Sequence, residues 1–188
     1  MALLIPRPLP NAWANRLGFA AVLAAALVTG INGQGIDEYQ VKAAFLYNFA
    51  KFVEWPPQAF KSSTEPIGVC VLGQDPFGRA LEQAVDGKQI GGRALVIRNI
   101  SNARESGSCQ ILFVSSSERK RLSSILAGVK ATGILTVGEM EGFAADGGVI
   151  NFKPENGRIR MEINVQAAEQ GRLRISSKLL NLAQIVKR

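Results

Sequence analysis

Two cysteines, Cys70 and Cys109, are the only thiols of this chain, and the chain contains no histidine. Without histidine, neither a Ser-His-Asp nor a Cys-His catalytic arrangement can form, and the commonest metal ligand of proteins is missing. The cysteines lie 39 residues apart, unlike the Cys-x-x-Cys spacing of redox motifs. We therefore expect no metal site, no cofactor and no thiol catalysis.

Carboxylates, lysines and serines are the remaining residues that could do chemistry. A glycosidase would need two acids held close together. The acidic candidates are scattered along the chain, and no pattern pairs them: Glu54, Asp75, Glu139, Glu141 and Asp146. The sequence therefore favours a protein that is not an enzyme.

Two turns follow a strand and precede a helix, which is where doubly wound proteins bind phosphate. The first, residues 73–78 (GQDPFG), lacks the spacing of glycine-rich nucleotide loops, and Asp75 puts a negative charge where an anion would bind. The second, residues 114–121 (VSSSERKR), offers the hydroxyls of Ser115 and Ser117 as possible ligand contacts. Capping of the following helix explains these serines more simply, and ligand contact is the alternative.

A glycine-rich stretch, residues 141–152 (EGFAADGGVINF), is a further candidate for a ligand loop. We favour the interpretation that its glycines supply positive φ angles where the chain turns into a hairpin. Two alternating runs after it flank Asn156-Gly157, a pair that strongly predicts a tight β-hairpin.

The elements that must position these residues alternate between strands and helices. Apolar, β-branched runs between turn signals predict buried strands at 66–73, 93–100, 109–115 and 132–139. Helices are predicted from Asp75 and Pro76, within 117–129, and after a short strand at the C-terminus. The buried face of that last helix would consist of Leu179, Leu180, Leu182, Ile185 and Val186. This order predicts an α/β fold: a mostly parallel sheet with helices on both faces and an antiparallel hairpin near the C-terminus.

An aromatic stretch, residues 43–57 (AAFLYNFAKFVEWPP), belongs to a helix predicted from Asp37 to Val53. Three- and four-residue spacing puts Val41, Phe45, Phe49 and Phe52 on its buried face. The opposite face would carry Lys42, Asn48 and Lys51. Tyr47 and Trp55 fit the buried face less well, so each is a candidate contact for a small ligand or a partner.

The first 35 residues differ from the rest of the chain. They carry Arg7 and Arg16 but no acid, an apolar run at 17–28, and small residues after it. This predicts a cleaved secretory signal peptide at 1–35 and a single exported domain at 36–188, with an uncleaved membrane anchor as the alternative. In an oxidising compartment the cysteine pair is most simply one structural disulfide. The net charge of the exported part, +5 and scattered, indicates solubility rather than nucleic-acid binding.

Five segments together resemble the YfiR family of periplasmic regulators. In chain order they are EYQVKAAFLYNFAKFVEWPP, VCVLGQDPFG, CQILFVSSSE, GGVINFKPENGRIRMEIN and RISSKLLNLAQIV. The resemblance implies a periplasmic, non-catalytic repressor that binds the periplasmic sensor domain of a YfiN-type inner-membrane diguanylate cyclase. Such a repressor lowers cyclic di-GMP and biofilm formation, and a YfiB-type outer-membrane lipoprotein sequesters it. A small-ligand-binding protein, with a pocket near residues 73–77 and 115–118, is the alternative.

The resemblance also implies a homodimer and one family disulfide, which Cys70 and Cys109 fit. Some relatives have a second cysteine pair near the glycine-rich loop, but residues 143–152 contain no cysteine here. Partner contacts would involve the hairpin, with Ile150, Phe152 and Glu162 leading, and parts of the C-terminal helix. The same side chains could instead belong to the core, and for Ile150 the core is the favoured interpretation.

Overall fold

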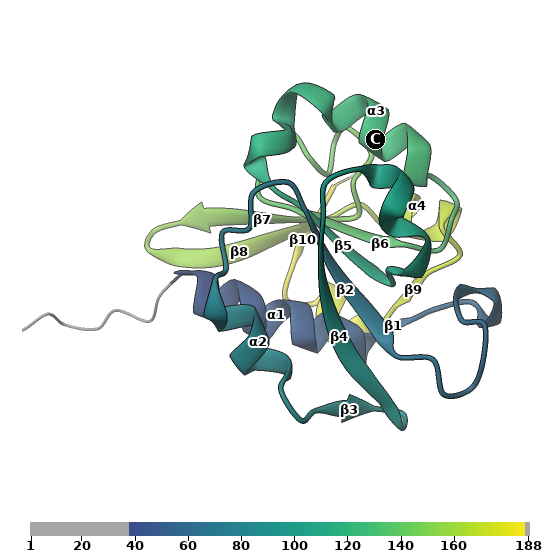
Figure 1. Ribbon diagram of the computed structural model, residues 1–188. Coiled ribbons are helices and arrows are strands. Elements are labelled where there is room, and N and C mark those ends of the chain that lie inside the picture. Colours follow the sequence, from purple (N-terminus) through teal and green to yellow (C-terminus); the bar gives the residue numbers. More distant parts are fainter. Residues whose placement is uncertain (1–37, 187–188) are drawn as a thin grey trace, which may run out of the picture. The chain divides into compact units, whose positions relative to one another are not determined.

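In the computed structural model, which describes residues 38–186, one eight-stranded sheet organises the chain (Figure 1). Its parallel part has the spatial order β4-β2-β5-β6-β7. The bounds of these strands are Ile67–Leu72 (β2), Arg93–Ile100 (β4), Ile111–Val114 (β5), Leu135–Gly138 (β6) and Ile150–Glu155 (β7). Every residue of β2, β5 and β6 is buried, as expected for strands covered on both faces.

Three antiparallel or short strands complete the sheet. β8 (Arg158–Ile163) forms a hairpin with β7, and β10 (Gln184–Ile185) runs parallel to β8 at one edge. β3 (Gln89–Ile90) forms the other edge beside β4. A separate two-stranded sheet joins β1 (Val53–Glu54) to β9 (Arg174–Ile175). The predicted α/β class, the mostly parallel sheet and the added hairpin are confirmed.

Helices cover the two faces of the sheet (Figure 1). On one face, α1 (Glu38–Phe52), α2 (Arg79–Val85) and α5 (Ser177–Leu180) contribute to the larger hydrophobic cluster. On the other, α3 (Leu122–Val129) contributes to a second cluster, near which the 3₁₀ helices η2 (Ala103–Ser108) and η3 (Ser116–Arg121) lie. The remaining helical segments are η1 (Pro57–Ala59) and α4 (Val165–Gln170), neither of which was predicted from the sequence.

Aromatic packing fixes α1 on the sheet. Phe49 is fully buried and stacks on Phe152 of β7, with ring centroids 5.8 Å apart, and Phe45 contacts both rings. The prediction that Lys42 lies on the outer face was wrong, because this side chain is buried at 2 % exposure. Burial is possible because two carboxylates meet its ammonium group, as described below. Val41, predicted to be buried, is only half-buried.

The second helix begins later than predicted. Asp75 does not cap it; instead, its Oδ1 accepts a hydrogen bond from the Phe77 amide at 2.8 Å, and α2 starts only at Arg79. Phe77 is buried, and its ring meets that of Phe113 at 4.7 Å. The extra turn before α2 lets Phe77 reach the core, which outweighs the strong helix-start signal at Asp75-Pro76.

The C-terminus also differs from prediction. α5 is a single turn, after which the chain extends as β10 and pairs with β8, with Gln184 opposite Glu162. Leu182 and Ile185 are therefore 65 % and 41 % exposed instead of buried. Residues 184 and 185 form backbone hydrogen bonds with the edge of β8 instead of continuing the predicted helix, although the apolar spacing of this segment favours a helix.

The predicted hairpin is confirmed. Asn156 and Gly157 have φ angles of +51° and +71°, the backbone of the tight turn that such pairs favour. In the part of the chain that the structure describes, no helix is long and apolar enough to cross a membrane. The predicted signal peptide lies outside the described residues and stays a prediction.

Candidate functional site

The carboxyl ends of β2 and β5 form the place where a ligand site is expected in this topology. Numbered along the chain, the parallel strands follow the spatial order 2-1-3-4-5. The connection that leaves β2 leads to β4 on one side, and the following connection leads to β5 on the other side, so the direction of the strand order reverses between β2 and β5. Open α/β sheets bind ligands at such a switch point. Gly73 and Gln74 extend from β2 there, and Ser115 and Ser117 extend from β5.

The two serines are brought together but serve the local backbone. Ser115 is buried and is the N-cap of η3, where its Oγ accepts from the Ser117 amide at 3.4 Å. The two hydroxyl oxygens lie 3.2 Å apart, and Ser117 Oγ accepts from the Gln74 amide at 3.0 Å. Their geometry therefore supports the capping interpretation and ties the turn after β2 to the turn after β5.

A cavity of about 430 Å³ lies beside this edge, on the α3 face of the sheet. Glu118 lines it and is 7 % exposed, while its carboxylate pairs with Arg121 Nη2 at 2.5 Å. Arg104 and Leu72 also line the cavity. The two serines do not line this cavity, whereas the neighbouring Glu118 does. Ligand contact by Ser115 and Ser117 stays a prediction. A buried carboxylate beside exposed guanidinium groups suits a small polar ligand.

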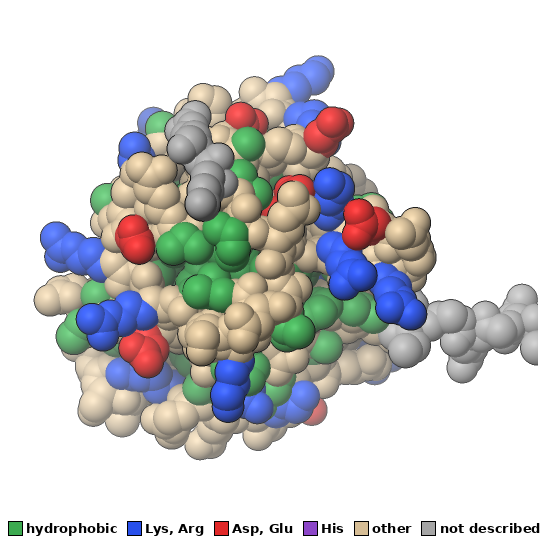
Figure 2. Space-filling model, turned by 180° about the vertical axis from the view of Figure 1, so that it is seen from behind, with side chains coloured by type: hydrophobic (Ala, Val, Ile, Leu, Met, Phe, Trp, Pro, Cys, Tyr) green, Lys and Arg blue, Asp and Glu red, His purple; other side chains and the backbone are tan. Residues whose placement is uncertain are grey.

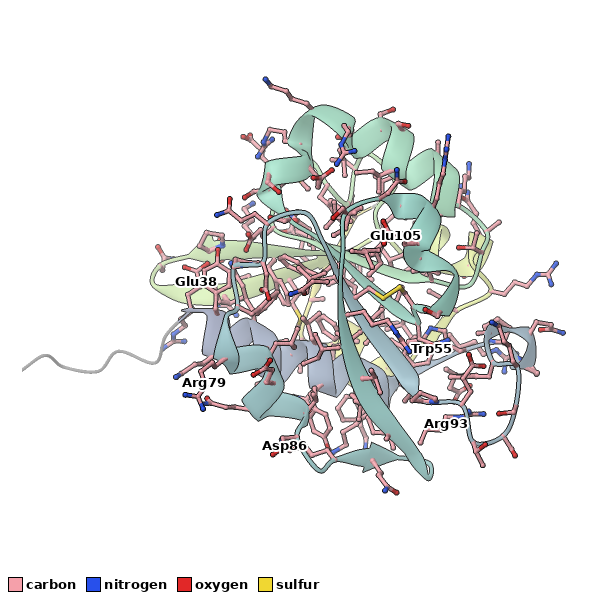
Figure 3. The ribbon with its side chains drawn as sticks, viewed as in Figure 1. Glu38, Trp55, Arg79, Asp86, Arg93 and Glu105 are labelled. Atoms are coloured by element: carbon pink, nitrogen blue, oxygen red, sulfur yellow. A yellow bond between two sulfur atoms is a disulfide. The ribbon has the colours of Figure 1, made fainter. Side chains whose placement is uncertain are left out.

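Tyr47 and Trp55, the other two candidate ligand contacts, lie elsewhere. The Tyr47 ring faces the ammonium groups of Lys88 at 4.4 Å and Lys51 at 5.6 Å. Trp55 donates from Nε1 to the Gln110 carbonyl at 3.1 Å, next to the amino end of β5. In Figure 3, Trp55 and Glu38 lie at opposite ends of α1. The four predicted ligand residues therefore do not form one site.

A partly buried ion cluster lies at the carboxyl end of β6, where the sequence analysis predicted none. Lys42 Nζ lies 2.5 Å from Glu139 Oε2 and 2.5 Å from Glu38 Oε1. Tyr39 donates its hydroxyl to Glu139 Oε1 at 3.4 Å. The four-residue spacing of Glu38 and Lys42 could have indicated their pairing. Nothing in the sequence could have paired them with Glu139.

Proton affinities in this cluster follow from burial and charge. Burial alone would lower the pKa of Lys42, but hydrogen bonds and charge attraction from Glu139 and Glu38 outweigh it and raise the pKa above its ordinary 10.5. Burial, followed by the negative charge of Glu139, raises the pKa of Tyr39 above 10.0. Both groups therefore keep their protons at neutral pH, and the cluster holds α1 to the sheet.

Cys70 and Cys109 form a disulfide, as predicted, with their Cα atoms 5.7 Å apart. Both are buried in the second hydrophobic cluster, and the sulfur bond is visible between η2 and the sheet in Figure 3. No free cysteine occurs within residues 38–186. No group of three or more acidic or cysteine side chains in that range is placed to hold a metal ion.

The hairpin residues proposed for partner contact differ in accessibility. Ile150 and Phe152 are 0 % and 1 % exposed, so their side chains belong to the core in this structure. The Glu162 side chain is only 17 % exposed; it accepts from Asn151 Nδ2 at 3.1 Å and pairs with Lys153 at 3.4 Å. Opposite Glu162 is β10, near the exposed Leu182 and Ile185. Figure 2 shows hydrophobic side chains gathered on the face opposite to that of Figure 1, with lysines and arginines around them.

Comparison with protein families identifies the chain. Residues 39–184 match the YfiR/HmsC-like family, a stretch that includes almost every described residue. The chain belongs to this family. YfiR/HmsC-like proteins are periplasmic, non-catalytic regulators of diguanylate cyclase signalling, and membership supports that general role here. No curated protein matches the chain.

Two solved structures share the fold of this YfiR/HmsC-like chain. One is an ABC domain from Streptococcus pneumonia in complex with L-Trp, with a TM-score of 0.52 at 10 % identity over 77 % of this chain. The other is a conserved domain protein from Vibrio cholerae, with a TM-score of 0.50 at 11 % identity over 80 % of this chain. The match spans 60 % of the length of each. At such identities the likeness concerns the fold alone.

Proposed function

We propose that this protein is an exported, non-catalytic repressor that binds the periplasmic sensor domain of an inner-membrane diguanylate cyclase. Repression lowers cyclic di-GMP and biofilm formation, and a YfiB-type outer-membrane lipoprotein relieves it by sequestering the repressor. The observation that carries this proposal is the family match over residues 39–184. A homodimer and an N-terminal signal peptide are parts of the same proposal.

The β7–β8 hairpin is the proposed contact with the cyclase. Residues from Lys153 to Arg158 around its turn are exposed, and the partly buried Glu162 pairs with Lys153 at the edge of this surface. Ile150 and Phe152 would act beneath this surface, because both are buried and the contacts of Phe152 with Phe45 and Phe49 of α1 set the position of the hairpin. Leu182 and Ile185, exposed on the neighbouring edge, supply apolar area next to it.

A deletion strain tests the proposal. We expect deletion to raise cellular cyclic di-GMP and biofilm mass, and the wild-type gene to restore both. Glu162→Lys should restore neither and should fail to co-purify the cyclase, while Glu82→Lys, an exposed charge reversal on α2, should behave as wild type. Unchanged cyclic di-GMP in the deletion strain would reject the proposal. Melting temperatures of both purified variants show whether a loss of repression or of cyclase binding results from destabilisation of the fold.

A second candidate function is the binding of a small periplasmic ligand at the carboxyl ends of β2 and β5. The cavity lined by Glu118 and Arg121 at the switch point favours it, and one structural neighbour was solved with L-Trp. Thermal-shift screening with L-Trp and other amino acids tests this function, because a ligand of the folded state raises the melting temperature. A hit that Glu118→Gln does not weaken would place the ligand elsewhere.

A further inference from the structure

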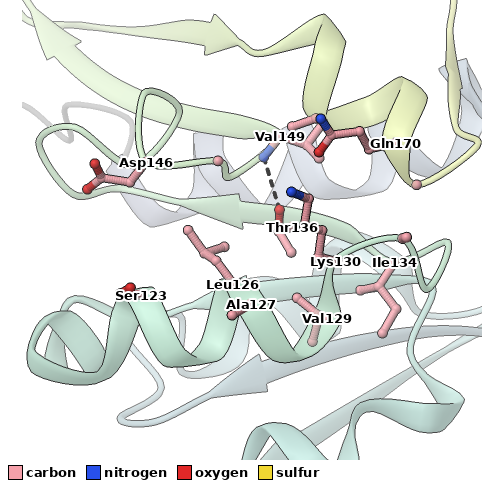
Figure 4. A pocket seen from close by; sticks show the side chains of 14 residues that line it. Ser123, Leu126, Ala127, Val129, Lys130, Ile134, Thr136, Asp146, Val149 and Gln170 are labelled. Atoms are coloured by element: carbon pink, nitrogen blue, oxygen red, sulfur yellow. Dashed lines mark hydrogen bonds between the residues drawn. The ribbon is translucent and has the colours of Figure 1, made fainter. Parts of the chain in front are cut away.

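A second cavity, of about 220 Å³, lies between α3 and α4, away from the switch point (Figure 4). Its walls come from α3, from the loop that follows it, and from residues 146–149 of the glycine-rich loop. Thr136 of β6 and Gln170 of α4 also line it. This volume is below the ~300–1,000 Å³ of sites for drug-sized ligands, so the space suits a small metabolite.

The cavity has an apolar wall. Leu126, Val129, Ile134 and Val149 line it, and each is at least nine-tenths buried in the free protein. Burial of a short hydrocarbon group against these side chains would stabilise a complex by about 0.8 kcal/mol for each CH₂ removed from water. The apolar part of a ligand therefore belongs on this side.

Three polar side chains, Lys130, Thr136 and Gln170, line one part of the cavity. In Figure 4 the Lys130 side chain reaches from the end of α3 toward Thr136 and Val149, and the Gln170 amide points in from α4. Within the described residues, no carboxylate pairs with Lys130. Thr136 Oγ1 accepts from the Val149 amide at 2.9 Å, and no described residue accepts the hydrogen of that hydroxyl. An exposed ammonium, an exposed carboxamide and a buried hydroxyl thus meet at this end of the cavity.

Asp146 is the one acidic side chain that lines this cavity. Figure 4 shows its carboxylate at the rim, turned away from the point where Lys130, Thr136 and Gln170 meet. The charge that faces the interior of the cavity is therefore positive. A ligand with a negative group at that point would form a charge-assisted hydrogen bond with Lys130.

We propose that the cavity between α3 and α4 binds a small organic carboxylate, with its carboxylate on Lys130, Thr136 and Gln170 and its apolar group on Leu126 and Val149. This site is separate from the hairpin surface and from the Glu118 cavity. The proposed carboxylate site does not depend on whether the protein represses a cyclase.

Isovalerate is a suitable probe, with isovaleramide and isopentylamine as its neutral and cationic counterparts. The protein, produced from its full 188-residue sequence, is titrated with each compound by calorimetry and by NMR of the ¹⁵N-labelled chain. We expect isovalerate to bind and to shift the amide signals of Thr136, Val149 and Gln170. Isovaleramide should bind about ten- to a hundredfold more weakly, the loss expected when a charge-assisted hydrogen bond is removed.

Three variants locate the site. Lys130→Met should weaken isovalerate binding by about ten- to a hundredfold, and Ala127→Leu should block it by filling the space while keeping a good helix former in α3. Lys120→Met removes an exposed lysine that does not line the cavity and should bind as wild type. The assignment is overturned if isovalerate fails to bind, if Lys130→Met binds it as tightly as wild type, or if isopentylamine binds in its place.

Discussion

Lys42 and Glu139 are 97 residues apart in the sequence, yet Nζ of one lies 2.5 Å from Oε2 of the other in the protein interior. The lysine belongs to α1, and the glutamate follows β6. Both side chains are at most 8 % exposed. This contact fixes the N-terminal end of α1 over the carboxyl edge of the sheet, next to the turns that carry Ser117 and Gln74.

Lys42→Met should destabilise the protein by about 3–5 kcal/mol, because it leaves the Glu139 carboxylate buried without its cation. Urea unfolding followed by circular dichroism measures the change. Lys51→Met removes an exposed lysine from the same helix and should cost less than about 0.5 kcal/mol. The double variant Lys42→Met/Glu139→Leu should regain much of the loss. Equal stabilities of the two single variants would contradict a structural role for the pair.

Stability should fall at alkaline pH. The folded state holds the Lys42 proton more tightly than the unfolded chain does, since its pKa is raised above 10.5. The stabilisation is therefore complete below about pH 10 and is lost as pH rises through the folded pKa. Tyr39 acts in the same direction, because its raised pKa favours the neutral phenol. Unfolding free energies between neutral and strongly alkaline pH test this, and Lys42→Met should show a shallower decline than wild type.

Loss of the disulfide should destabilise the protein by about 2–5 kcal/mol. The bridge joins Cys70 of β2 to Cys109, which caps η2 just before β5, across a sequence separation of 39, and removing it frees the intervening segment in the unfolded chain. Cys70→Ala/Cys109→Ala, compared with wild type by urea unfolding, provides the measurement. Wild-type protein unfolded and refolded with a reducing agent should match the double variant. A difference below about 1 kcal/mol would show that the bridge contributes little.

Gly148→Ala should destabilise by about 1–3 kcal/mol, the usual range for overpacking. The Phe143 ring is fully buried against both Gly138 and Gly148, and a Cβ at Gly148 would overlap it. Gly107→Ala is the matched control, since nothing lies within 4 Å of its added methyl group. Thermal unfolding compares the two. Adding Phe143→Leu to Gly148→Ala should cost less than the sum of the single changes, and strict additivity would refute the contact.

The sequence was sufficient for the fold class because strand and helix patterns alternate strongly from Ile67 to Gly138. The buried strands carry β-branched residues between turn signals, and Asn156-Gly157 determined the hairpin. Predictions failed where a long-range contact outweighed a local preference. Burial of Phe77 delayed the start of α2, and pairing with β8 drew Gln184 and Ile185 into a strand.

The candidate sites were less predictable than the fold. Ser115 and Ser117 were placed at the correct sheet edge, because carboxyl ends of parallel strands meet there. Lys42 was assigned to the wrong face, since periodicity treats every lysine as a surface residue and cannot anticipate a buried carboxylate 97 residues away. Cavities such as the one beside Lys130 arise from the spacing between helices, which no local pattern describes.

The sheet ends at both edges in strands of only two residues, β3 and β10. β3 covers only Arg93 and Ala94 of β4, and β10 covers only Glu162 and Ile163 of β8. Within the described residues, the rest of each long strand therefore keeps one edge whose backbone amides and carbonyls pair with no strand. Such an edge is a template for an added strand, so a partner can bind by extending the sheet at either end as well as through side-chain contacts.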